Sequence, residues 1–351
     1  MWKSCRNVDG AAYNSPRYLM TRLQLLAVEA GITLVFLVAL YAIIGWPFDG
    51  GGADNDGGIA SADPTPIASS AATATPASSP GVSSSTTPAS NDDCAPDVTR
   101  SFLSANEIVS FYGNPYAATL GILGQHSLED LPGLLRDQAN AIDQLNGLRG
   151  VQPAFHIVYA TAQGSPGEDG DYLNYVDPDT LQEYIDAACQ NHFLAFLDLQ
   201  NGQSDPLTEL KKIEPYLTKS NVHVAMDPEF TMHDGEIPGQ AIGHLDASQI
   251  NAVQQELESF IEANGLGDKV LIVHQFDEGM ITDKENIQRF PHVQLVIDMD
   301  GFGKPEVKIK KFGLFAQPAE HSGIKVFFSQ DDPPLTDQQI VDLNPDVVIF
   351  Q

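Results

Sequence analysis

The tripeptide Asp227-Pro228-Glu229 carries the clearest chemical signal in the sequence. In an extended strand, residues two positions apart point to the same face, with Cα atoms ~6.5 Å apart. A carboxyl group beside another carboxylate has a raised pKa, so it can stay protonated and act as a general acid. Glycoside hydrolysis needs such an acid, and a second group that supports the oxocarbenium-like transition state. We therefore predict Glu229 and Asp227 as the catalytic residues.

Further polar residues at or near the ends of apolar runs are predicted to bind the substrate. They are Tyr112, Asn114, Asp198, Gln200, His274, Glu278, Asp298 and Asp300. Neither an HxH nor an HExxH motif occurs, so we expect no metal and no cofactor. A metal-dependent hydrolase is therefore the second interpretation, with oxygen and imidazole ligands from Asp198, Asp227, His274, Asp298 and Asp300.

Eight short apolar runs alternate with helical patterns, which predicts a single (β/α)₈ TIM-like barrel. A doubly wound open sheet is the alternative. The expected strands are 107–112, 153–159, 193–199, 222–227, 270–276, 293–299, 324–328 and 346–350. The expected helices are 129–145, 178–190, 206–217, 246–264, 304–315 and 335–342, with a short one near 283–288.

Alternation within the expected strands favours the barrel. In 222–227, Val222, Val224 and Met226 share one face, while His223 and Ala225 lie on the other and lead to the two carboxylates. The run 293–299 splits in the same way, with its carboxylates at the carboxyl end. Active sites of barrel enzymes lie at that end of the strands. Lone histidines on the lumen face (His156, His223 and His274) are more often core groups than ligands.

An Asp-x-Glu motif at the end of the fourth barrel strand resembles the family-18 chitinases and family-25 lysozymes. This resemblance implies that Glu229 is the acid and that Asp227 assists the substrate's acetamido group. The sequence departs from the chitinase pattern at His223 and Ala225, where further aspartates are expected. The runs FYGNPY, MDPEF, VHQF and IDMDGFG also resemble uncharacterised membrane-anchored bacterial barrel proteins, which implies a fold but no activity.

The segment before the barrel predicts a membrane anchor and a linker. Residues 1–29 form a cytoplasmic N-terminal segment, and residues 30–48 are uncharged, apolar and long enough to span a bilayer as a helix. A cleaved signal peptide is the alternative. Residues 49–93, rich in Gly, Ala, Ser, Thr and Pro, predict a disordered linker. Basic residues before the apolar segment predict a single-pass cell-membrane protein whose domain, residues 94–351, is extracytoplasmic.

Charge and cysteines agree with this placement. The formal net charge is −29, of which residues 94–351 carry −25, so nucleic acid is not an expected partner. Cys94 and Cys189 are the only cysteines outside the cytoplasmic segment, and a disulfide between them is expected. The leading interpretation is a glycoside-hydrolase-like protein that acts on cell-envelope or extracellular carbohydrate. A non-catalytic glycan-binding barrel is the alternative outside the enzyme class.

Overall fold

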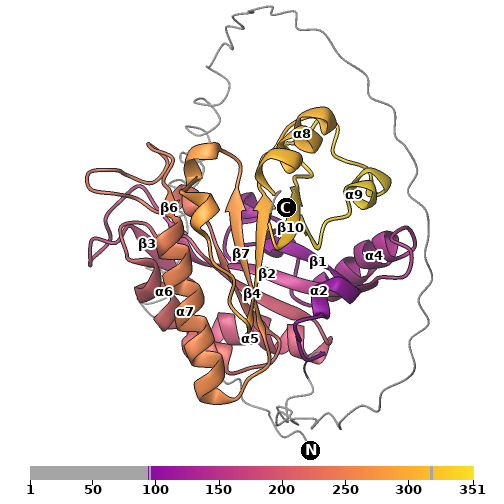
Figure 1. Ribbon diagram of the computed structural model, residues 1–351, viewed down its shortest axis with the longest axis horizontal. Coiled ribbons are helices and arrows are strands. Elements are labelled where there is room, and N and C mark those ends of the chain that lie inside the picture. Colours follow the sequence, from indigo (N-terminus) through magenta and orange to yellow (C-terminus); the bar gives the residue numbers. More distant parts are fainter. Residues whose placement is uncertain (1–93, 95, 317–318) are drawn as a thin grey trace, which may run out of the picture.

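Eight parallel strands pair in one closed ring in the structure, a computed structural model that describes residues 94, 96–316 and 319–351 (Figure 1). The ring runs β1-β2-β4-β5-β7-β9-β10-β11 and closes through pairing of β11 with β1. The strands are β1 (Asn106–Gly113), β2 (Gly150–Ala162), β4 (Leu194–Leu199), β5 (Val222–Met226), β7 (Lys269–Gln275), β9 (Val293–Met299), β10 (His321–Val326) and β11 (Val347–Phe350). The predicted barrel is confirmed, and the open sheet is excluded.

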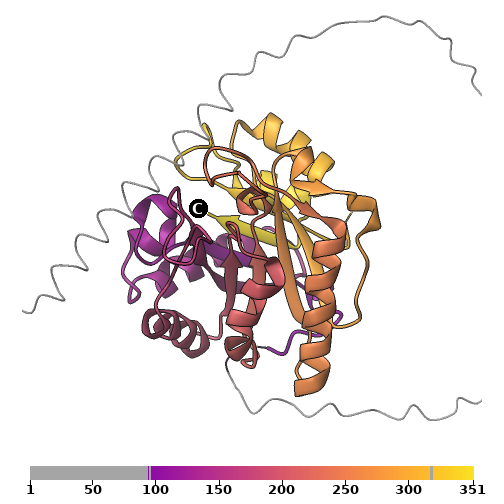
Figure 2. The same ribbon diagram turned by 90° about the vertical axis from the view of Figure 1, so that its left-hand side faces the viewer.

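Helices cover the outside of the barrel (Figure 2). They are α4 (Leu131–Asp143), α5 (Pro178–Gln190), α6 (Pro206–Leu217), α7 (Ala247–Asn264), α8 (Pro305–Phe315) and α9 (Asp337–Leu343). Their starts follow from the sequence, because an aspartate N-cap precedes proline in α5 and α6, and Asp246 forms a capping box with Gln249 in α7. Six predicted helices are thus confirmed within one or two residues.

The connection after β7 lacks an α-helix. It holds the 3₁₀ turns η3 (Glu278–Met280) and η4 (Lys284–Asn286), where a short helix near 283–288 was expected. Between them β8 (Ile281–Thr282) pairs with β6 (Leu245–Asp246), before α7. In the long connection after β2, β3 (Leu173–Tyr175) pairs antiparallel with the end of β2. Small additions of this kind elaborate the loops around the mouth.

Two large clusters make up most of the apolar core, as the predicted alternation requires. Val222, Val224 and Met226 pack in the layer between barrel and helices, whereas Ala225 lies in the lumen cluster. Along β9, Val296 belongs to the lumen and its neighbours Leu295 and Ile297 to the outer layer. The side chains at the alternate strand positions shared by Ala225 and Val296 therefore point to the barrel axis.

The N-terminal end of the barrel is closed by the segment before β1. Val98 and Phe102, at the start of α2 (Phe102–Ala105), join the lumen cluster. The predicted disulfide is confirmed: Cys94 bonds to Cys189 at the end of α5, with Cα atoms 4.1 Å apart. Apolar side chains of the described residues thus fill this end of the lumen.

The expectations for residues 1–93, including the anchor at 30–48, fall outside the described residues. Among the described residues, no helix is long and apolar enough to cross a membrane.

Candidate metal centre

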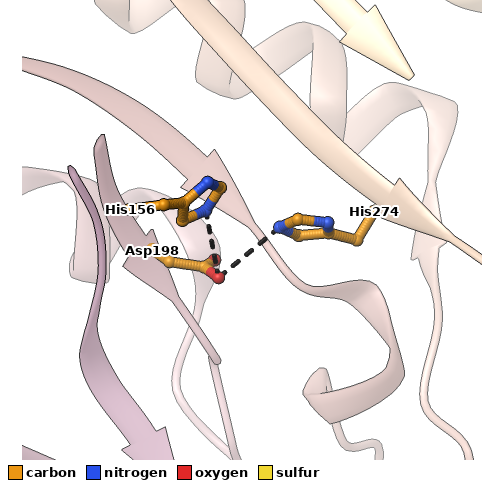
Figure 3. A group of neighbouring side chains, drawn as sticks. All are labelled: His156, Asp198 and His274. Atoms are coloured by element: carbon orange, nitrogen blue, oxygen red, sulfur yellow. Dashed lines mark ion pairs between the residues drawn. The ribbon is translucent and has the colours of Figure 1, made fainter. Parts of the chain in front are cut away.

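Three buried side chains from three strands converge inside the barrel mouth (Figure 3). His156 comes from β2, Asp198 from β4 and His274 from β7, and all three are fully buried. Nε2 of His156 lies 3.4 Å from Oδ2 of Asp198, and Nε2 of His274 lies 3.5 Å from the same oxygen. Two imidazoles therefore approach one carboxylate from different sides.

These separations fit ligands around a metal ion better than they fit hydrogen bonds. Hydrogen bonds of this kind have N···O distances of about 2.7–3.2 Å. Two ligand atoms each about 2.0–2.1 Å from a tetrahedral zinc ion lie about 3.3 Å apart. Among the described residues, both oxygens of Asp198, both ring nitrogens of His156 and Nε2 of His274 have no hydrogen-bond partner. The group of three can hold a metal ion.

Asp298 fixes the orientation of His274. Its Oδ2 lies 2.9 Å from Nδ1 of His274, so Nδ1–H donates to this carboxylate and Nε2 is directed at Asp198. Carboxylate–histidine pairs of this type orient metal-binding imidazoles. On β10, Gly323 makes room for Asp298, because a Cβ at this position would lie 2.7 Å from Oδ1 of Asp298.

Burial and mutual charge set the protonation of the three converging groups. Burial acts to raise the pKa of Asp198, but His274 and His156 outweigh it and hold that pKa well below its usual range. Burial acts to lower the pKa of His274, but Asp198 and Asp298 hold it well above its usual range. Burial lowers the pKa of His156 to about 4, so this imidazole is neutral and able to bind a metal.

A buried lysine lies beside the three. Nζ of Lys325, from β10, is 3.1 Å from Oδ2 of Asp300 and 3.5 Å from the ring centroid of Tyr112. Asp300 follows the end of β9, and its Oδ2 lies 3.6 Å from Nδ1 of His274. Burial acts to lower the pKa of Lys325, but Asp300 and other carboxylates hold it above its usual range. Lys325 is therefore a permanent cation in the site.

The predicted catalytic pair lies at the same mouth, although not on one strand face. β5 ends at Met226, and Pro228, which has no N–H to offer a neighbouring strand, begins the 3₁₀ turn η2 (Pro228–Phe230) that holds Glu229. Burial, with the charges of Asp198 and Asp300, raises the pKa of Asp227 to about 7. Burial and the charge of Asp227 raise the pKa of Glu229 well above its usual range. Both groups can thus carry a proton near neutral pH.

Comparison with known proteins decides neither the fold nor the function. No protein-family model matches the chain, and no match is found among the curated proteins. A solved structure of oxaloacetate acetylhydrolase in complex with the product oxalate is similar over 64% of this chain and 79% of its own, with 12% sequence identity and a TM-score of 0.37. At that score the likeness supports no statement about activity. The barrel is established by the strand pairing of this chain itself.

The remaining predicted residues fall into different environments. Gln200 is buried, and its amide joins the backbone N–H of Ala162 to Asp227, at 2.8 and 3.5 Å. Asn114 donates to the carbonyl of Val158 and to Thr161, which fixes the loop after β1. Glu278 is exposed in η3, outside the buried cluster. Among the predicted set, Tyr112, Asp198, Gln200, His274, Asp298 and Asp300 are brought together with Asp227 and Glu229.

Sequence reasoning gave no site role to two residues of this cluster. His156 was treated as a core histidine. Its position on β2, where the side chain points into the lumen, was the signal that could have identified it as a site residue. Lys325 is the single charge in the run IKVFF, and its burial in a strand was a second such signal. A buried lysine inside an apolar strand needs a charged partner, and here that partner is Asp300.

Proposed function

We propose that the barrel is a divalent-metal-dependent hydrolase whose ion is held by His156, Asp198 and His274. The observation that carries this proposal is the convergence of two Nε2 atoms on one carboxylate oxygen at 3.4 and 3.5 Å, which is longer than good hydrogen bonds. An ion bound there would displace the proton that Asp198 and Asp298 favour on His274. Burying polar groups without hydrogen bonds costs free energy, and a bound ion would reduce that cost. The Asp298–His274 pair supplies the orienting contact typical of metal-binding histidines.

Nitrogen and oxygen donors select the candidate ions. Imidazole and carboxylate ligands suit Zn²⁺, Mn²⁺ and Fe²⁺, and a catalytic zinc has three protein ligands and one open position. Zn²⁺ is our first choice, because the two N···O separations, 3.4 and 3.5 Å, are close to the spacing of tetrahedral ligands. The sequence expectation of no metal is replaced here by a proposed single site.

The ion would supply an activated water and a Lewis acid that polarises the scissile carbonyl. Glu229 and Asp227 would transfer protons, since both have raised pKa values and follow directly after the end of β5. Gln200, whose Nε2 lies 3.5 Å from Oδ2 of Asp227, would at most bias the position of this carboxyl weakly. Lys325 would hold Asp300 in position.

The substrate that we propose is a neutral or cationic acylated glycan of the cell envelope. The domain carries −25 and its mouth gathers carboxyl groups, which disfavours anionic substrates. The Cys94–Cys189 disulfide supports an oxidising, extracytoplasmic location, in agreement with an anchor at residues 30–48. A reporter fused after residue 93 would be extracytoplasmic if this topology holds, and a cytoplasmic reporter would contradict it.

The test combines metal removal with one substitution at the mouth. The full chain is assayed on acetylated chitin-like and peptidoglycan oligosaccharides before and after chelation, and after Zn²⁺ is restored. We expect chelation to abolish hydrolysis and zinc to restore it. Glu229→Gln should slow turnover by about 10²–10⁴-fold without lowering the melting temperature. The matched control is Glu278→Gln, an exposed glutamate outside the cluster, which should retain full activity.

A metal-independent glycosidase is the second candidate. The raised pKa values of Glu229 and Asp227 favour it, because a protonated carboxyl beside a second carboxyl is what cleavage of a glycosidic bond requires. Full cleavage of a glycosidic bond in the presence of chelator, lost in Glu229→Gln, would select this candidate. Binding of glycans without any cleavage would select the non-catalytic barrel.

A further inference from the structure

The part of the mouth that holds Asp227, Asp298, Asp300 and Lys325, called here its outer half, offers more oxygen ligands than one ion needs. Asp227, Asp298 and Asp300 each have a buried Oδ1 that lacks a hydrogen-bond partner among the described residues. His274, Asp298 and Asp300 lie close enough together to hold an ion of their own. Hydrolases with two metal ions about 3.5–4 Å apart are built from such adjoining ligand groups. This cluster therefore has donors for a second ion.

Lys325 lies in this outer half. Its side chain is 3% exposed, and its Nζ is 3.1 Å from Oδ2 of Asp300, one of the donors that a second ion would use. The aromatic face of Tyr112 lies 3.5 Å away on another side of the ammonium. The backbone of Lys325 is held in turn, because Nζ of Lys308 donates to its carbonyl oxygen at 2.7 Å.

The two buried lysines of this region differ in what they neutralise. Lys308 pairs with Asp331 at 2.9 Å and donates to the carbonyls of Gly301 and Lys325, as a structural lysine does. Lys325 instead directs its charge into the carboxylate cluster, where Asp300 is its closest partner. An ammonium is a compact point charge that can stand in for a cation among carboxylates.

We infer that the Lys325 ammonium takes the place of a second metal ion, so that the centre holds one divalent ion per chain. This inference rests on the proposed function, since it presupposes the ion at His156, Asp198 and His274. A divalent cation among the outer carboxylates would be repelled by the ammonium at short range. The second group would also need Nδ1 of His274, which already donates to Asp298 at 2.9 Å. Lys325 is thus a positioning residue that sets the number of ions.

The experiment counts ions in the full chain purified in detergent. Every protein carries His292→Gln, because Glu258, Glu262 and His292 form another group of donors on the surface that could bind an ion. Bound Mn²⁺ and Zn²⁺ are measured by elemental analysis after gel filtration. Electron paramagnetic resonance of the Mn²⁺ form separates an isolated ion from a spin-coupled pair.

Lys325→Met removes the charge and keeps the length of the side chain. We expect one ion per chain with an uncoupled spectrum in the parent, and two ions with a coupled spectrum in Lys325→Met. Lys325→Arg keeps the charge and should keep one ion. Lys284→Met, a partly buried lysine of η4 outside the cluster, is the matched control and should also keep one. Lys325→Gln, which should also bind two ions, replaces Lys325→Met if that variant does not fold.

The outcomes separate the two claims. Two ions in the parent, or a single ion in both folded neutral variants at Lys325, would overturn the inference and leave the proposed function standing. No ion in the parent would overturn the proposed function, and the inference with it.

Discussion

Two histidine–aspartate pairs lie at opposite ends of the same two strands, with the same geometry. At the start of β7 and β9, Nδ1 of His292 is 2.9 Å from Oδ1 of Asp268. At the other end of these strands, Nδ1 of His274 is 2.9 Å from Oδ2 of Asp298. The His292 side chain is 46% exposed and that of His274 is fully buried. The contact alone therefore does not distinguish a surface ion pair from part of a site.

The difference lies in what the second ring nitrogen meets. Nε2 of His274 faces the buried carboxylate of Asp198, which His156 also approaches. Among the described residues, this nitrogen, both ring nitrogens of His156 and both oxygens of Asp198 lack a hydrogen-bond partner. The backbone N–H of His292 donates to Glu258, and its ring is open to water. The buried pair aimed at further unpartnered donors is therefore a stronger candidate for a metal site than the group of Glu258, Glu262 and the half-exposed His292.

The largest effect should come from removing a histidine at one end only. His274→Ala deletes one of three proposed ligands, so metal affinity should fall by more than the about 10–100-fold that the loss of an orienting partner costs. Hydrolysis should fall with it. His292→Ala should leave high-affinity binding and hydrolysis unchanged. Isothermal titration with Zn²⁺ measures the zinc affinity of each variant. Equal losses of affinity in His274→Ala and His292→Ala would contradict the proposed difference between the two ends of the strands.

The orienting aspartates give a smaller effect. Asp298→Asn should weaken zinc binding by about 10–100-fold, because the amide no longer holds Nδ1–H of His274 as strongly. Asp268→Asn, the same change at the other end of the strands, should leave zinc affinity at the mouth unaltered. Competition with a coloured chelator determines both affinities. An unchanged zinc affinity in Asp298→Asn would show that Asp298 does not orient His274 for metal binding.

At the closed end, polar groups should matter for stability rather than for binding. The ammonium of Lys269 donates to the carbonyls of Lys219 and Val222, at 2.7 and 2.9 Å. Lys269→Met leaves these buried carbonyls without that donor, which should lower the free energy of unfolding by about 1–3 kcal/mol. Urea unfolding measures this loss, and zinc affinity should be that of the wild type. A large loss of zinc binding in a folded Lys269→Met protein would contradict the division between the ends.

The smallest effect should be a pH dependence of the exposed pair. The hydrogen bond from His292 to Asp268 raises the pKa of His292. A raised pKa in the folded state means that the pair's contribution to stability is complete below the unfolded pKa of about 6.5, and is lost as pH rises through the folded value. Because the ring is nearly half exposed, water screens the pair and the change is small.

This pH dependence is measured as the difference in melting temperature between the wild type and His292→Gln. Chelator is present throughout, and the range runs from about pH 5.5 to about pH 8.5. The wild type should be the more stable protein at the acid end, and the difference should shrink as pH rises. A difference that grew with pH would reverse the assigned direction of the shift.

The architecture was largely predictable from residue patterns. Alternation in β5 and β9 separated lumen from outer side chains, and the order of strands and helices predicted the barrel. The helix starts were readable because Asp177-Pro178 and Asp205-Pro206 combine an N-cap with a helix-starting proline. The turn at Pro228–Phe230 was not part of the leading prediction, which kept Glu229 on the strand face, because the turn depends on where β5 stops pairing with its neighbours.

The site was predictable in part. Carboxylates at strand ends showed where the mouth would be, because parallel strands in a closed barrel end on the same rim. The meeting of His156 and His274 on Asp198 was not readable, since the three come from strands far apart in the sequence and form no local motif. Their convergence depends on barrel closure and strand register, which no single segment encodes.

Anomalous diffraction from crystals of the full chain grown with Zn²⁺ tests the central claim most directly. We predict one strong peak inside the barrel mouth, about 2.0–2.2 Å from Nε2 of His156, Nε2 of His274 and Oδ2 of Asp198. Nδ1 of His274 should remain hydrogen-bonded to Asp298. The absence of zinc at this position, with both imidazoles hydrogen-bonded directly to Asp198, would contradict the metal centre and the function that we propose for it.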